Sequence, residues 1–67
     1  MNSDLFIKIS GRDEFGSLVE QARRVLVGKK VVVVDISRQT IQVADAKFQD
    51  VCPFLALAGI NAEYLSF

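Results

Sequence analysis

The chain contains no histidine and no tryptophan, and its 67 residues include a single cysteine and a single proline. Activation of a serine, cysteine or lysine nucleophile needs a neighbouring base, which is most often histidine. The carboxylates and lysines that remain show no paired spacing, so we predict that the protein is not an enzyme and that it binds no cofactor or metal. A lone cysteine also excludes an internal disulfide and is typical of proteins from a reducing compartment.

An excess of charge of one sign is also lacking, because eight Lys and Arg residues balance eight Asp and Glu residues. A neutral chain has no long-range field to attract nucleic acid or an anionic membrane, and it self-associates more readily than a charged one. No apolar run approaches the roughly 20 residues that span a bilayer, and the N-terminal segment MNSDLFIKIS lacks the pattern of a signal peptide. We expect a cytoplasmic protein that binds neither nucleic acid nor membrane.

The cations that are present include one local cluster, formed by Arg23, Arg24, Lys29 and Lys30. Two interpretations of this cluster stay open. Cations are favoured near the C-terminal end of a helix, where they complement the helix dipole. Alternatively, the four side chains form a patch for an anion or an acidic partner.

Apolar spacing predicts the first four elements. Leu5, Ile7 and Ile9 alternate as in a strand, with Phe6 on the opposite face. A helix follows, which we expect to be capped by Asp13 and to end at Gly28; its apolar stripe comprises Phe15, Leu18, Val19, Ala22, Val25 and Leu26. The segments KKVVVVDIS and TIQVAD predict two strands that form a hairpin around SRQT, the first of them buried in part on both faces.

The single proline governs the second helix. Apolar residues recur at helical spacing before Gly59, at Phe48, Val51, Cys52, Leu55 and Ala58. Proline costs about 3 kcal/mol in a helix interior but is tolerated in a first turn, so we expect the regular helix to begin near Asp50 and to hold Pro53 in its first turn. We expect Cys52 to pack in the core, where a thiol is inert.

The final segment, NAEYLSF, predicts a last strand, which completes the order strand, helix, strand, strand, helix, strand. With right-handed crossovers, this order gives a four-stranded antiparallel sheet with two helices on one face. We therefore predict a single α+β domain over residues 1–67, with the ferredoxin-like βαββαβ fold.

Three segments resemble heavy-metal-associated domains, which share this fold: VEQARRVLVG, VVVDIS with TIQV, and LAGINAEYL. That family binds a soft ion such as Cu(I) through two thiolates in a Gly-Met-x-Cys-x-x-Cys loop. The corresponding loop here is GRDEFGS, in which counting from Gly11 puts Glu14 and Ser17 at the cysteine positions. The resemblance therefore carries over no metal ligand. The first strand and helix are also similar to those of histidine-containing phosphocarrier proteins, although this chain has no histidine to accept a phosphoryl group.

Hydrophobic residues make up 51% of the chain, and so small a domain must leave part of them exposed. Strand alternation suggests where. If Val32, Val34 and Ile36 face the helices, then the open face of the sheet carries Phe6, Val31 and Val33. On the second helix, two further apolar residues lie off the inward stripe, Phe54 and Leu57.

We predict that these five residues, Phe6, Val31, Val33, Phe54 and Leu57, form an interface for a second copy of the chain or for another protein. On this interpretation the chain is a small interaction or regulatory module. Two alternatives stay open. One is a divergent metal-carrier or phosphocarrier-like regulator, and the other is a phage- or plasmid-borne inhibitor of a host complex.

Overall fold

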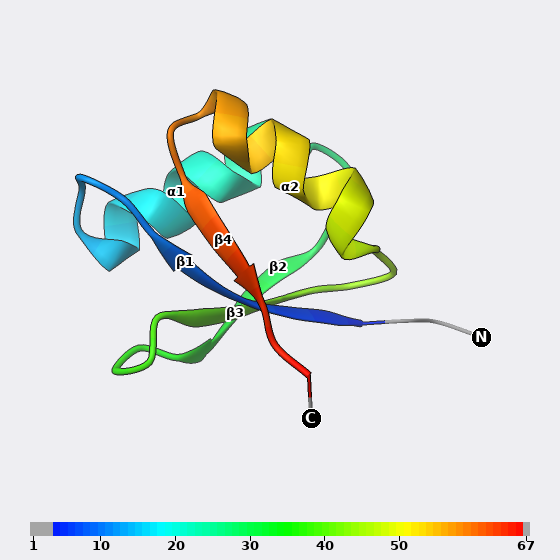
Figure 1. The fold of residues 1–67 in the computed structure, drawn as a ribbon, viewed down its shortest axis with the longest axis horizontal. Helices are drawn as coiled ribbons and strands as arrows, with labels where there is room; N and C mark the ends of the chain where they lie inside the picture. The colour runs from blue at the N-terminus through cyan, green and yellow to red at the C-terminus, as the bar shows by residue number, and fades with distance from the viewer. Residues whose placement is uncertain (1–3, 67) are drawn as a thin grey trace.

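The computed structural model describes residues 4–66, which form one antiparallel sheet with the strand order β2-β3-β1-β4 and two helices on one of its faces (Figure 1). The elements are β1 (Leu5–Ser10), α1 (Phe15–Val25), β2 (Val31–Asp35), β3 (Thr40–Val43), α2 (Phe48–Leu57) and β4 (Asn61–Tyr64). This is the ferredoxin-like βαββαβ arrangement, so the predicted fold is confirmed. Of the predicted last strand, Phe67 lies outside the described residues.

One apolar core fills the space between the sheet and the helices. The central strands β1 and β3 contribute Ile7 and Ile41, α1 contributes Leu18, and α2 contributes Leu55, all fully buried or nearly so. α1 packs on β1 and β2, whereas α2 packs along β4. The predicted apolar stripes of both helices face this core, with the exception of Cys52, because their residues recur at the spacing that keeps one side of a helix inward.

The ends of α1 differ from the prediction at both caps. The N-cap residue is Glu14, because the carboxylate of Asp13 accepts a hydrogen bond from the side-chain amide of Gln21, at 2.7 Å, instead of capping the helix. At the other end Leu26 is the C-cap, and Gly28 follows two residues later with φ +86°. Gly28 therefore turns the chain towards β2 after the helix has ended.

α2 begins at Phe48, two residues before the predicted start, so Pro53 lies inside the helix and not in its first turn. The first turn closes ahead of the proline, because the N–H groups of Asp50 and Val51 both bond to the carbonyl of Lys47. Pro53 removes one later donor, but it lies on the exposed side of the helix, where water can serve the carbonyl of Gln49.

The turn between α2 and β4 is a Schellman motif. The N–H of Ile60 bonds to the carbonyl of Leu55 at 2.9 Å, and the N–H of Gly59 bonds to the carbonyl of Ala56 at 3.0 Å. Gly59 has φ +77°, a conformation that glycine adopts without a steric penalty. Leu55 and Ile60 are both buried, so the turn anchors the start of β4 in the core.

The two faces of β2 are the reverse of the predicted ones. Val31 and Val33 pair with buried residues of β3, and cross-strand partners share a face of the sheet. Val31 is consequently buried and Val33 half-buried beneath the helices, whereas Val32 and Val34 are 41% and 49% exposed on the open face. The prediction that Val31 and Val33 lie on the open face is wrong. Four consecutive valines contain no polar residue that would distinguish one face from the other.

Candidate interaction surface

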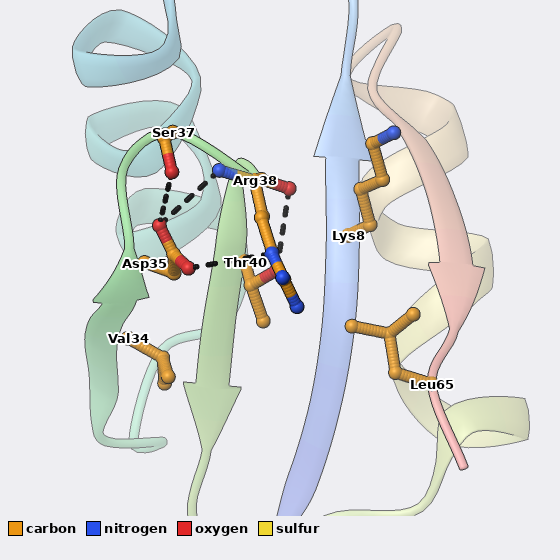
Figure 2. Close-up of a pocket in the computed structure, with 7 residues that line it drawn as sticks. All are labelled: Lys8, Val34, Asp35, Ser37, Arg38, Thr40 and Leu65. Carbon is orange, nitrogen blue, oxygen red and sulfur yellow. Dashed lines mark hydrogen bonds and ion pairs between the residues drawn. The ribbon is translucent and has the colours of Figure 1, made fainter. Parts of the chain in front are cut away.

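The face of the sheet that the helices leave uncovered carries a hollow of about 530 Å³ (Figure 2). Its walls come from all four strands or the residues beside them. Val34 of β2 and Leu65, just after β4, supply apolar surface on opposite sides, and Lys8 and Arg38 supply two cations. The rest of the lining is formed by Asp35, Ser37 and Thr40.

The β2–β3 hairpin at one end of the hollow is held by Asp35. Its carboxylate accepts hydrogen bonds from the hydroxyl of Ser37 at 2.7 Å and from the backbone N–H of Arg38 at 3.3 Å, and it lies 3.8 Å from Nε of Arg38 (Figure 2). The bond from Ser37 is the main reason why the pKa of Asp35 is lowered from its ordinary value. Asp35 therefore presents a fixed negative charge at the C-terminal end of β2.

Apolar surface continues from the hollow towards the middle of the open face. Phe6 of β1 lies there, as predicted, and is half-buried. It pairs across the sheet with Gln42 of β3, which in turn pairs with Val32 of β2. We call this set of apolar residues the open-face surface; it comprises Phe6, Val32, Val34 and Leu65.

The outer edge of β2 carries backbone groups that β3 does not use. Ala44 donates its N–H to the carbonyl of Lys30 at 3.0 Å, which makes these two residues a hydrogen-bonded pair of the ladder. Such pairs alternate along an antiparallel ladder, so the next one is formed by Val32. The N–H and C=O groups of Val31 and Val33 therefore point away from β3, and β2 is an outer strand of the sheet.

A groove of about 450 Å³ runs between this edge and α1. We call it the edge groove; its apolar lining is Phe15, Val19, Val33 and Ile36. Arg23 of α1 crosses it, with Nη1 3.0 Å from a carboxylate oxygen of Glu20 and Nη2 3.4 Å from the carbonyl oxygen of Val31. One outward carbonyl of β2 is thus covered by a side chain from the same molecule.

The apolar residues predicted on α2 form a separate surface. Phe54 and Leu57 are exposed as predicted, at 53% and 87%. They belong to the helical layer, on the other side of the sheet from the open-face surface (Figure 1). The structure therefore does not bring the five predicted interface residues together.

All four residues of the predicted cationic cluster are exposed. Arg23 and Arg24 occupy the last turn of α1, where they complement the helix dipole. Lys29 donates from Nζ to the backbone carbonyl of Asp45 at 2.8 Å, which ties the loop after α1 to the loop after β3. Structural contacts therefore account for Arg23 and Lys29, and an anion-binding role for the cluster stays a prediction.

The positions that correspond to metal cysteines have other contacts here. Glu14 is the N-cap of α1, and the hydroxyl of Ser17 accepts a hydrogen bond from the side chain of Gln21 at 3.2 Å. Within residues 4–66, no group of three or more His, Cys, Asp or Glu side chains is placed to hold a metal ion. Cys52 is a free thiol and is half-buried, less enclosed than predicted.

In the same described part of the chain, none of the helices has the length and apolar character that a bilayer span requires. Comparisons with protein-family models, with curated proteins and with solved structures return no match. The resemblance to heavy-metal-associated domains and to phosphocarrier proteins therefore stays a prediction. The surfaces described above are the remaining basis for a function.

Proposed function

We propose that the protein is a non-catalytic interaction module whose working surface is β2 together with the neighbouring open-face surface. One observation carries the proposal: the apolar side chains along this outer strand and its extension are exposed, with Val32 at 41%, Val34 at 49% and Ile36 at 72%. We further propose a cytoplasmic location, which the lone cysteine supports.

An exposed apolar outer strand needs an explanation because N–H and C=O groups that point away from the neighbouring strand are a template for another chain. Soluble proteins usually protect such strands with charged side chains, proline, bulges or a covering loop. From Val31 to Val34, β2 has neither charge nor proline. A bulge between Val33 and Asp35 interrupts its register with β3, but it leaves the first three valines in regular pairing.

The energetic gain from covering this surface is large for so small a domain. Burying a valine or isoleucine side chain completely contributes about 1.5–3 kcal/mol. Since Val32, Val34 and Ile36 are roughly half exposed on average, a partner that covers them adds several kcal/mol, on the order of half the stability of a small domain. Binding a partner is therefore the use that best fits the surface.

Affinity capture with matched variants tests the proposal. The baits are the wild-type chain, the double variant Val32→Lys/Val34→Lys, and the control Val27→Lys, which changes an 85% exposed valine in the loop after α1. We expect the wild type and Val27→Lys to retain the same protein from a lysate of the source cell, an untagged copy of this chain included. The double variant should bind that protein at least about tenfold more weakly, a loss of at least about 1.4 kcal/mol.

Circular dichroism and thermal melting of each bait serve as the control for folding. Both changed valines of the double variant lie on the open face, so its fold should be preserved. If the baits are correctly folded and the double variant retains every captured protein as well as the wild type does, the proposed surface is wrong.

A further inference from the structure

We infer that the occupant of the β2 edge is β2 of a second copy of this chain, paired antiparallel so that the two sheets join into one. This inference rests on the proposed function and names the partner for the same strand. It follows from three features of β2: its outward hydrogen-bonding groups, its side chains and the charges at its ends.

The hydrogen-bonding groups fit one register. Antiparallel pairing of two identical outer strands requires a twofold axis perpendicular to the sheet, which keeps the helices of both copies on the same side. A register centred on Val32 places Val31 of each copy opposite Val33 of the other. Val31 and Val33 are the residues whose N–H and C=O groups point away from β3, so each of these pairs exchanges two N–H···O bonds.

The side chains fit the same register. The two Val32 side chains meet on the open face, next to the twofold axis, where each is 41% exposed in the single chain. Val31 and Val33 meet on the helical face, where the edge groove supplies apolar surface from Phe15 and Val19. Valine therefore meets valine at all three positions, with no polar side chain enclosed between the strands.

The charges select an antiparallel second copy. Lys30 precedes the valine run and Asp35 follows it, so the centred register brings Lys30 of each copy beside Asp35 of the other. Parallel pairing in register would instead place like charges opposite one another. The formal net charge of zero adds no long-range repulsion between the copies.

Arg23 has to move to make room for the second copy. Its bond to the carbonyl of Val31 is long, at 3.4 Å, and its contact with Glu20 is shorter, at 3.0 Å. An N–H from Val33 of the second copy replaces Arg23 at that carbonyl, while the ion pair with Glu20 is retained. The edge is therefore protected in the monomer by a contact that a second copy can displace.

Sedimentation equilibrium between about 1 μM and about 1 mM tests the inference, because this range covers association free energies from about −8 to about −4 kcal/mol. We expect the wild type to form a reversible dimer and Val32→Lys to be monomeric, since it places two like charges on the axis. Val33→Pro should weaken the dimer at least about 100-fold because it removes a donor at the interface and leaves the β2–β3 ladder intact.

Two controls match these variants. Ala62→Pro makes the same change in β4, where the N–H of Ala62 points away from β1 because the Phe6–Leu65 pair is the hydrogen-bonded one. Val27→Lys makes the same apolar-to-charged change away from the strand. Both should dimerise like the wild type.

Disulfide trapping tests the register. In a Cys52→Ala background, Val32→Cys places two thiols at a pair with Cα atoms about 4.5 Å apart, within the span of a disulfide. Val34→Cys faces Lys30 of the second copy instead. We expect covalent dimers from the first variant and few from the second under mild oxidation; equal yields would show that the register is wrong.

The remaining outcomes separate this inference from the proposed function. A wild-type monomer throughout the range overturns the inference, and so does a dimer that persists in both Val32→Lys and Val33→Pro. If the chain is monomeric but Val32 and Val34 still determine what is captured from lysate, the module binds another protein and the proposed function stands. If neither self-association nor capture depends on these residues, both are wrong.

Discussion

β2 and β4 are both outer strands of the sheet, but their side chains are very different. β4 has the sequence NAEY, with a carboxylate at Glu63 and a polar residue at its start. β2 has the sequence VVVVD, in which four residues pass without a polar side chain. Charge on an outer strand discourages pairing with another molecule. The sequence thus protects one edge of the sheet and leaves the other suited to association.

Both edges also make contacts with the rest of the molecule. Tyr64 of β4 lies edge-to-face against Phe48 of α2, with ring centroids 5.8 Å apart and an interplanar angle of 67°. Beyond the strand, Leu65 donates its N–H to the carbonyl of Phe6 at 3.0 Å. At the β2 edge, Val31 and Val33 pack beneath the helices, and the outward carbonyl of Val31 accepts the long bond from Arg23. Side chains of both edges therefore contact the helical layer, and the two edges differ in the bond that covers an outward carbonyl of β2.

The largest expected effect on the free energy of unfolding distinguishes the inner backbone groups of β2, which point towards β3, from the outer ones, which point away from it. Val32→Pro removes an N–H of the β2–β3 ladder and leaves a carbonyl of β3 unpaired, so it should lower the free energy of unfolding by about 3 kcal/mol. Val33→Pro removes an outward N–H and part of a half-buried side chain, and should cost about 1 kcal/mol. Urea denaturation at low micromolar concentration measures both. A larger loss for Val33→Pro than for Val32→Pro would mean that the alternation of inner and outer groups is reversed.

A second prediction compares how much side-chain packing at each edge of the sheet contributes to stability. Tyr64→Ala removes the ring that packs on Phe48 and should lower the free energy of unfolding by about 1–2 kcal/mol. Ile36→Ala, next to β2, should change it by less than about 0.5 kcal/mol, because its side chain is mostly exposed. Thermal and urea unfolding of the two variants give the comparison. A larger loss for Ile36→Ala would show that the β2 edge is the better packed one.

The sequence predicts the elements that carry a clear alternation and fails where that alternation is missing. In β1 the charged Lys8 lies between Ile7 and Ile9 and so marks the outward face of the strand. The valine run of β2 fits either face equally well. Its facing is decided by pairing with Ile41 and Val43 of β3, which the sequence indicates only if the hairpin register is known.

The bulge in β2 changes the register in which this strand pairs with β3, and the sequence does not indicate that change. Val33 pairs with Ile41, but Asp35 pairs with Thr40, so one extra residue of β2 is accommodated between them. Nothing in SRQT marks such a bulge. For this reason Val32 and Val34 were missed as surface residues, whereas the exposure of Phe54 on α2 followed correctly from helical spacing. Leu65 lies within the predicted last strand, NAEYLSF, for which the sequence does not distinguish the two faces; its place beside Phe6 follows from the bond of its N–H to the carbonyl of Phe6.

A third prediction concerns the β4 edge, where the charge of Glu63 discourages pairing with another molecule. Glu63→Val gives β4 an apolar side chain on the open face, so both edges become suited to association. We expect the variant to form open-ended oligomers, seen as concentration-dependent light scattering, under conditions where the wild type stops at a dimer. Glu63→Gln, which removes the charge but keeps a polar side chain, should scatter less. If the Val variant behaves like the wild type, charge at Glu63 is not what protects β4.

The smallest expected effect concerns the charge at the end of β2. The pKa of Asp35 is lowered from its ordinary value of 3.8, chiefly by the hydrogen bond from Ser37 and next by the backbone N–H of Arg38. When folding lowers the pKa of a carboxyl group, the group stabilises the fold at pH values above its ordinary pKa. This contribution is lost as the pH falls through the lowered pKa of the folded state. In an NMR titration, Ser37→Ala should raise the pKa of Asp35 towards its ordinary value.

Arg38→Ala is the matched control for this titration. It keeps the backbone N–H and removes only the guanidinium, whose attraction is the weakest of the contributions to the pKa of Asp35, so its effect should be smaller than that of Ser37→Ala. Because Asp35 of each copy lies beside Lys30 of the other in the inferred dimer, protonation of Asp35 should also weaken dimerisation in acid. A dimer whose dissociation constant is unchanged through the titration of Asp35 would show that this pair does not help to select the antiparallel partner.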